Sequence, residues 1–143
     1  MRTLHSLILL TAFGLMVGCG PPAGPTLYPV SGKVTFEGKA VTPAMVTYSP
    51  DSAKGHVSNI APSGQVDADG NYTLMTEDKA GAPKGWYKVM INTNVMPKEM
   101  PKDGKMSKAI GIPAKYSSVT GTTLSIEVTE AGTPAQYELK LMK

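Results

Sequence analysis

One cysteine, Cys19, is present among the 143 residues of the sequence. Without a second cysteine the chain cannot form an internal disulfide, so burial of side chains has to hold the fold together. Histidine is almost as scarce, with His5 and His56 the two in the chain. Because a zinc site needs several Cys or His ligands, the sequence predicts no metal site, and nothing in it indicates a cofactor.

Catalytic motifs are missing as well. The sequence has no Gly-x-Ser-x-Gly turn, Gly-rich phosphate loop or paired-carboxylate helix. Behind the N-terminal apolar stretch, a Ser-His-Asp arrangement has only His56 to use, and this residue lies in a polar stretch where we expect a solvated loop. The sequence therefore predicts a non-catalytic protein without catalytic residues, and a hydrolase is the least favoured alternative.

The charge balance is mild, with 14 Lys and Arg residues against 11 Asp and Glu residues and a formal net charge of +3. Proteins that bind nucleic acid neutralise several phosphates with clustered basic side chains, so this balance argues against a nucleic-acid partner. Aromatic residues make up 6% of the chain, which leaves Val, Ile and Leu to build most of the core.

The longest apolar stretch runs from Leu7 to Cys19, behind Arg2. It is shorter than the roughly 20 residues that a permanent membrane-spanning helix needs, and its length is typical of the hydrophobic segment of a secretory signal peptide. We therefore predict a signal peptide at residues 1–18. The mature chain then starts at Cys19 and has 125 residues, enough for one domain.

The end of this stretch, Leu15-Met16-Val17-Gly18-Cys19, resembles the lipobox of bacterial lipoproteins, with Met16 in place of the usual Leu, Val or Ile. The resemblance implies that Cys19 is lipidated, with diacylglycerol on its sulfur and fatty chains such as palmitate. Each buried methylene contributes about 0.8 kcal/mol, so two or three chains hold a protein at a bilayer essentially permanently. Gly20 after the cysteine, rather than Asp, implies the outer membrane. A plain cleaved signal with a spare thiol and an uncleaved anchor are the alternatives.

Residues 19–27 follow the predicted cleavage site and include Pro21, Pro22 and Pro25. Proline lacks the backbone N–H that helices and strand ladders require, so this segment is predicted to be an extended, semi-rigid tether of about 3 Å per residue. It leads into a domain predicted for residues 28–143.

Apolar and polar residues alternate repeatedly between Val30 and Leu141. This period of two is typical of strands with one buried face, and no helical stripe is visible outside the signal. Asp69-Gly70 between two of the runs predicts a tight hairpin. The pattern predicts an all-β fold, a single seven-stranded antiparallel β-sandwich. The expected strands are 30–37, 44–49, 63–68, 71–76, 85–93, 124–128 and 137–141.

Three segments carry a family resemblance: 28–41 (YPVSGKVTFEGKAV), 69–74 (DGNYTL) and 85–89 (GWYKV). They resemble the carboxypeptidase regulatory-like domain and, more closely, short bacterial lipoproteins built on that domain, whose pre-strand segment is similar to 112–116 (IPAKY). The resemblance implies a transthyretin-like or immunoglobulin-like sandwich in a group that is not known as catalytic. It implies no ligand, because one fold hosts many functions.

The stretch Asp67-Ala68-Asp69-Gly70-Asn71 has the alternating oxygens of a calcium loop. It lacks the further acidic residue that closes an EF-hand loop, and Asp-Gly between two alternating runs is typical of a turn. We therefore predict a turn here and no metal site.

Residues 94–111 form a long segment in which lysine and methionine alternate. One interpretation is a solvated, mobile insertion, and the other is a surface that contacts anionic headgroups or an acidic polymer. Trp86 is expected to project away from the core, where it either offers a glycan-binding platform or covers the sheet edge. The candidate binding residues are Trp86, Lys98, Lys102, Lys105 and Lys108.

Together these features predict an exported, lipid-anchored protein of the cell envelope that presents a β-sandwich as a structural or binding module. The alternative is a carbohydrate- or cell-wall-binding module that uses the basic segment and Trp86. The expected partners are the membrane, through the anchor on Cys19, and cell-wall polysaccharide or envelope proteins.

Overall fold

The structure is a computed structural model that describes residues 24–96 and 110–143. The predicted signal peptide 1–18, the lipidation site Cys19 and the first part of the tether lie outside these residues. The described chain is all-β, with twelve strands and three 3-10 turns, η1 (Ser52–Lys54), η2 (Ala114–Ser117) and η3 (Pro134–Tyr137). None of the helical turns in this part of the chain has the length and apolar character of a membrane-spanning segment.

The larger sheet has six strands, and every pairing within it is antiparallel. Its centre is the pair β10 and β4, which run side by side from Tyr87 opposite Pro50 to Asn92 opposite Met45. Both strands were predicted from alternation. The order across the sheet is β11 (Ser125–Val128), β10 (Gly85–Asn92), β4 (Ala44–Pro50), β5 (Ser63–Val66), β7 (Met75–Thr76) and β8 (Lys79–Ala80).

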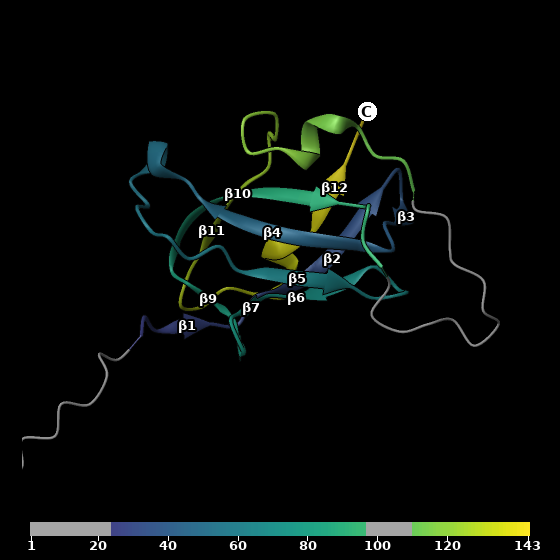
Figure 1. Ribbon diagram of the computed structural model, residues 1–143. Coiled ribbons are helices and arrows are strands. Elements are labelled where there is room, and N and C mark those ends of the chain that lie inside the picture. Colours follow the sequence, from purple (N-terminus) through teal and green to yellow (C-terminus); the bar gives the residue numbers. More distant parts are fainter. Residues whose placement is uncertain (1–23, 97–109) are drawn as a thin grey trace, which may run out of the picture.

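The smaller sheet is built around β2 (Ser31–Phe36), which pairs with β12 (Leu139–Leu141), β3 (Lys39–Ala40) and β6 (Asn71–Thr73). β12 runs parallel to β2, with Leu139 opposite Val34 and Leu141 opposite Phe36. The prediction of a purely antiparallel sandwich is therefore wrong at this pair. Figure 1 shows β12 beside β2, where the C-terminal part of the chain joins the smaller sheet after leaving β11 in the larger one.

The prediction of a turn at Asp69-Gly70 is confirmed, and the two predicted segments beside it run antiparallel: Asp67 N–H donates to the Asn71 oxygen at 2.8 Å, and Ser63 of β5 lies opposite Met75 of β7. Between these two points the hairpin is interrupted at β6. β5, before the turn, pairs with β4 in the larger sheet, whereas β6, after it, pairs with β2 in the smaller one. The Asp67 carboxylate stabilises the turn by accepting hydrogen bonds from the backbone N–H groups of Asp69 at 2.9 Å and Asn71 at 2.8 Å. The turn therefore carries the chain from one sheet to the other.

The core consists of apolar side chains from both sheets and from the segments that join them. Each of the seven predicted segments contains at least one strand, and the segment 71–76 contains two, β6 and β7, separated by the buried Leu74. Four two-residue strands were not predicted, so the count of seven is not confirmed: β1 (Leu27–Tyr28), β3, β8 and β9 (Ala82–Pro83). The buried predicted residues include Val30, Val34, Val46, Tyr48, Tyr72, Leu74, Tyr87, Val89, Ile91, Val128, Leu139 and Leu141.

Candidate functional site

Trp86 is the one predicted binding residue that lies within the described part of the chain. It is the second residue of β10 and faces outward from the larger sheet, because its neighbour Tyr87 points into the core. Glu127 of β11 is its cross-strand partner. The indole is half-buried, so the outward direction expected from alternation is present but the ring is not fully exposed.

Lys54 covers one face of the indole. This lysine ends η1, the turn that follows β4, and its Nζ lies 3.5 Å from the centre of the Trp86 ring. A cation–π contact of this kind contributes about 0.5–1 kcal/mol at an exposed site. None of the aromatic ring pairs among residues 24–96 and 110–143 includes Trp86. The site thus consists of the Lys54 cation on the single Trp86 ring, and the described residues add no second aromatic ring on which a sugar could stack.

His56 lies in the loop between η1 and β5, as predicted, but its ring is half-buried and not fully solvated. Its Nδ1 lies 2.9 Å from the backbone oxygen of Trp86, and the edge of its ring packs on Tyr87 with 4.5 Å between ring centres. Because a carbonyl oxygen can only accept, Nδ1 carries the hydrogen. The half-buried imidazole fits there because Gly85 has no side chain: a Cβ on Gly85 would lie 2.7 Å from Nδ1.

Asp51 lies beside His56 but does not form a catalytic pair with it. The buried Asp51 carboxylate accepts a hydrogen bond from the backbone N–H of Ala53 at 3.2 Å and caps η1. Its backbone N–H donates to the oxygen of Trp86, which also accepts from His56. The bonds between these residues place the turn against the start of β10, and their geometry gives the hydrolase alternative no support.

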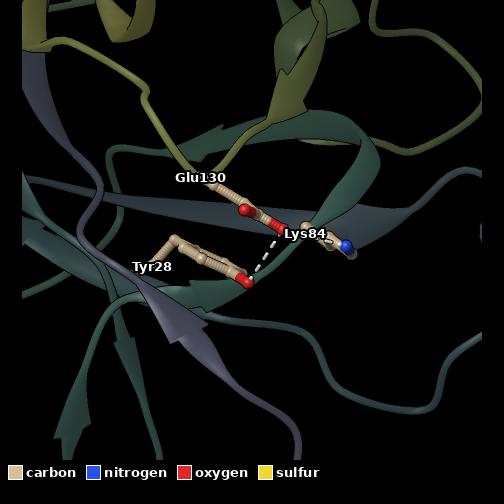
Figure 2. A network of polar contacts seen from close by, with 3 residues as sticks. All are labelled: Tyr28, Lys84 and Glu130. Atoms are coloured by element: carbon tan, nitrogen blue, oxygen red, sulfur yellow. Dashed lines mark hydrogen bonds and ion pairs between the residues drawn. The ribbon is translucent and has the colours of Figure 1, made fainter.

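The N-terminal strand β1 is attached to the domain close to Trp86. Tyr28 of β1 pairs with Ala82 of β9, which precedes β10 along the chain. Figure 2 shows the contacts that support this strand: the Tyr28 hydroxyl donates to Glu130 Oε1 at 3.2 Å, and Lys84 Nζ lies 3.0 Å from the same oxygen. Lys84 holds the pKa of Glu130 below its usual range. Exposed ion pairs stabilise little, so β1 depends mainly on its pairing and packing.

These features all lie at one end of the strands, which we name the tether end because the chain enters the domain there. Pro50 at the end of β4 and Val128 at the end of β11 both lie beside the start of β10. Figure 1 shows β1 and β9 at the lower left of the molecule and the turn after β4 at the upper left. The tether end comprises Tyr28, Lys54, Val57, Lys84, Trp86 and Glu130. Apart from Trp86, sequence reasoning missed these residues, because only strand pairing brings them together.

The predicted basic segment does not begin at the tether end. Lys98, Lys102, Lys105 and Lys108 lie outside the described residues. The chain leaves β10 at Asn92, six residues beyond Trp86 and about 20 Å along the strand. The Gln65 side chain there donates to the backbone oxygen of Met96 at 2.5 Å. The two parts of the predicted carbohydrate site therefore start from opposite ends of β10.

A shallow hollow of about 360 Å³, with both polar and apolar walls, lies on the smaller sheet. Its walls offer hydroxyl and amide groups from neighbouring strands, together with one cation, Lys33, and one anion, Glu138, which pairs with Lys140 at 3.3 Å. Such groups can bind a polar ligand through hydrogen bonds and charge. No group of three His, Cys, Asp or Glu side chains within 24–96 and 110–143 is placed to bind a metal ion. The lining residues are Ser31, Gly32, Lys33, Asn71, Tyr72, Thr73, Pro134 and Glu138.

Neither a family model, nor a curated protein, nor a solved structure matches the chain. The likeness to lipoproteins with a carboxypeptidase regulatory-like domain therefore stays a prediction.

Proposed function

We propose that this chain is a lipid-anchored protein of the bacterial cell envelope, and that its β-domain is a non-catalytic structural or binding module. The observation that carries the proposal is the order of three segments ahead of the domain. An apolar stretch of signal-peptide length ends at Gly18-Cys19, and a proline-rich spacer follows directly. This order is what export and lipidation of a cysteine require, since the lipidated residue has to be separated from the folded part.

The position of β1 supports the same proposal. The first described strand begins at Leu27, where the proline-rich spacer ends, and its pairing with β9 ties the start of the domain to the rest of the fold. The spacer is therefore joined to the β-domain through a strand that is hydrogen-bonded to β9, so the domain stays firmly connected to the anchor. Gly24, Pro25 and Thr26, ahead of that strand, are exposed.

We further infer that the domain is a seven-stranded sandwich of the transthyretin-like or immunoglobulin-like type. Two sheets that share one core of buried side chains support the sandwich arrangement. The seven predicted segments supply its strands, and the additional two-residue strands are short pairings at its margins.

Metabolic labelling tests the anchoring. Cells expressing the full chain are fed an alkyne-tagged palmitate, and membrane and soluble fractions are compared between the natural protein and Cys19→Ser. We expect label and membrane retention for the natural protein and the loss of the label in the variant. A natural protein that takes up no label and remains in the soluble fraction would contradict the proposal.

A second candidate is contact with cell-wall polysaccharide, which the hollow on the smaller sheet favours because its hydroxyl and amide groups suit a polyhydroxylated ligand. Isolated cell-wall sacculi are sedimented with the lipidated protein in detergent. Binding by this hollow is expected to fall in Asn71→Ala and to persist in Trp86→Phe. Equal loss in both variants, or no sedimentation of the natural protein, would contradict this assignment.

A further inference from the structure

We propose that the tether end of the domain rests on the bilayer that holds the anchor, with Trp86 and Val57 at the level of the lipid headgroups. This inference rests on the proposed lipid anchoring and adds to it an interaction surface and an orientation. The partner is a phospholipid surface, and the contact consists of residues that lie within the described domain.

Chain connectivity selects this end. The nine residues 19–27 span at most about 30 Å when fully extended. They enter the domain at Tyr28, which is fixed opposite Ala82. The opposite end of the domain is farther from the point of attachment by about the length of β10, whose eight residues extend about 26 Å. The spacer would have to be almost fully extended to present the opposite end, so the tether end is the surface that the attachment favours.

The chemistry of the tether end suits a lipid interface. Tryptophan is enriched at membrane–water interfaces, where its apolar ring and polar N–H are both satisfied. The Lys54 ammonium on the Trp86 ring is exposed and placed to meet lipid phosphates. Val57 follows His56 in the adjacent loop, and 87% of its surface is exposed, the largest value among the exposed large hydrophobic residues of the described chain.

The tether end is too weakly charged to bind a bilayer without the anchor. Lys84 is already paired with Glu130, and Glu127 lies opposite Trp86, so the two carboxylates balance Lys54 and Lys84. Attachment through fatty chains confines the domain near the bilayer surface. The resulting high effective concentration of the domain at the surface raises the occupancy of a weak contact. Exposed apolar residues also occur elsewhere, Met96 and Met142 among them. The point of attachment, rather than exposure alone, therefore decides the orientation.

The single tryptophan makes this contact measurable, because Trp86 is the one indole in the chain. The purified lipidated protein is reconstituted into vesicles of phosphatidylethanolamine and phosphatidylglycerol, with and without brominated lipids that quench indole fluorescence at the interface. Flotation of the vesicles reports anchoring in the same sample. We expect the protein to float and its Trp86 emission to fall by about twofold or more with brominated lipid.

Two variants act as controls. In Trp86→Phe/Phe36→Trp the reporter moves to the last residue of β2, at the opposite end of the smaller sheet, and we expect its emission to be unchanged by brominated lipid. In Lys54→Ala/Val57→Asn we expect Trp86 quenching to fall by about half or more, because an apolar residue and a cation are lost from the interface.

The outcomes separate the two proposals. A protein that floats but shows no more quenching at Trp86 than at the Phe36→Trp reporter is anchored, and the proposed contact is then wrong. A lipid-independent Trp86 signal that instead changes when cell-wall polysaccharide is added also overturns the contact. A protein that does not float overturns the anchoring, and the contact that rests on it is withdrawn with it.

Discussion

The phenol oxygens of Tyr48 and Tyr72 lie 2.9 Å apart and join the two sheets, since Tyr48 belongs to β4 and Tyr72 to β6. The Tyr72 hydroxyl also lies 2.7 Å from the backbone oxygen of Tyr137. Because that carbonyl can only accept, Tyr72 donates to it, and Tyr48 must donate to Tyr72. The three groups form a directed chain of hydrogen bonds through the core, with Tyr72 as its centre.

The direction of this chain predicts unequal effects of two similar substitutions. Tyr48→Phe removes one donor and is expected to lower the free energy of unfolding by about 1 kcal/mol, whereas Tyr72→Phe leaves a buried hydroxyl and a buried carbonyl unpaired and is expected to cost about 2–5 kcal/mol. Urea unfolding of both variants and of the double variant measures the difference. Equal losses in the two single variants would contradict the assigned direction.

Removal of the Tyr137 hydroxyl is expected to have the opposite effect on the free energy of unfolding. The hydroxyl is buried and has no hydrogen-bond partner among residues 24–96 and 110–143. Since an unpaired buried hydroxyl is costly, Tyr137→Phe is expected to leave the free energy of unfolding unchanged or to raise it by up to about 1 kcal/mol. The same urea titration, with Tyr48→Phe as the matched control, checks this. A loss above about 1 kcal/mol would show that the hydroxyl has a partner.

The contact between His56 and β10 predicts that Gly85 cannot be replaced. Gly85 and Gly55 both have positive φ, 142° and 80°, but a Cβ on Gly55 meets nothing within 4 Å, whereas one on Gly85 overlaps the imidazole. Gly55→Ala is expected to cost about 1–2 kcal/mol from backbone strain, and Gly85→Ala about 1–3 kcal/mol more from overpacking. In a His56→Ala background the part of this excess that comes from overpacking should disappear, so the cost of Gly85→Ala should fall. An unchanged cost there would contradict the role given to His56.

Acid stability depends in part on the turn at Asp67. Slight desolvation of the exposed carboxylate opposes its charge, but hydrogen bonds from Asn71 and from the backbone of Asp69 and Gly70 outweigh this effect and hold the pKa of Asp67 below its usual range. The stabilisation is therefore present above the unfolded-state pKa of about 3.9 and is lost as the pH falls through the folded-state value.

Comparison with Asp67→Asn isolates this effect. At pH 6 the natural protein is expected to be more stable than the variant by up to about 1 kcal/mol, since the carboxylate is exposed and solvent screens it. Urea unfolding from pH 6 to pH 2 measures the gap between the two proteins, which should close with acidification. A gap that is constant over this range would contradict the prediction.

Alkaline stability should reflect the buried tyrosines. Burial raises the pKa of Tyr87 to about 12 and raises the pKa values of Tyr48 and Tyr72 further. The unfolded chain loses these protons near pH 10 and the folded one does not, so stability falls as the pH rises above about 10. Absorbance at the phenolate band should show delayed ionisation of several tyrosines, coincident with the loss of near-ultraviolet circular dichroism. Full ionisation near pH 10 with the fold intact would contradict this.

Alternation predicted the strands because it depends on residues that are neighbours in the chain. Val46 and Tyr48, like Val89 and Ile91, are buried as their spacing requires. Pairing could not be predicted in the same way. Asp69-Gly70 determines a turn locally, but whether β5 and β6 share a sheet depends on β4 and β2. The two-residue strands β1 and β9 have no pattern of their own and exist because they pair with each other.

In the candidate site, too, local features could be predicted and contacts between distant segments could not. The outward direction of Trp86 followed from its position next to Tyr87, but the lysine on its ring could not be foreseen, because Lys54 arrives there only through the pairing of β4 with β10. The partial burial of the His56 ring was missed for a similar reason. Its neighbours in the chain are polar, whereas the slot it occupies is created by Gly85, which is distant in sequence.

Mass spectrometry of the mature protein, extracted from cell envelopes, tests the central claim most directly. Lipid anchoring predicts an N-terminal peptide that begins at Cys19 and carries a diacylglyceryl group on sulfur, with residues 1–18 absent. A protein that retains Met1, or one whose Cys19 is a free thiol, would contradict the anchoring and the membrane contact inferred from it.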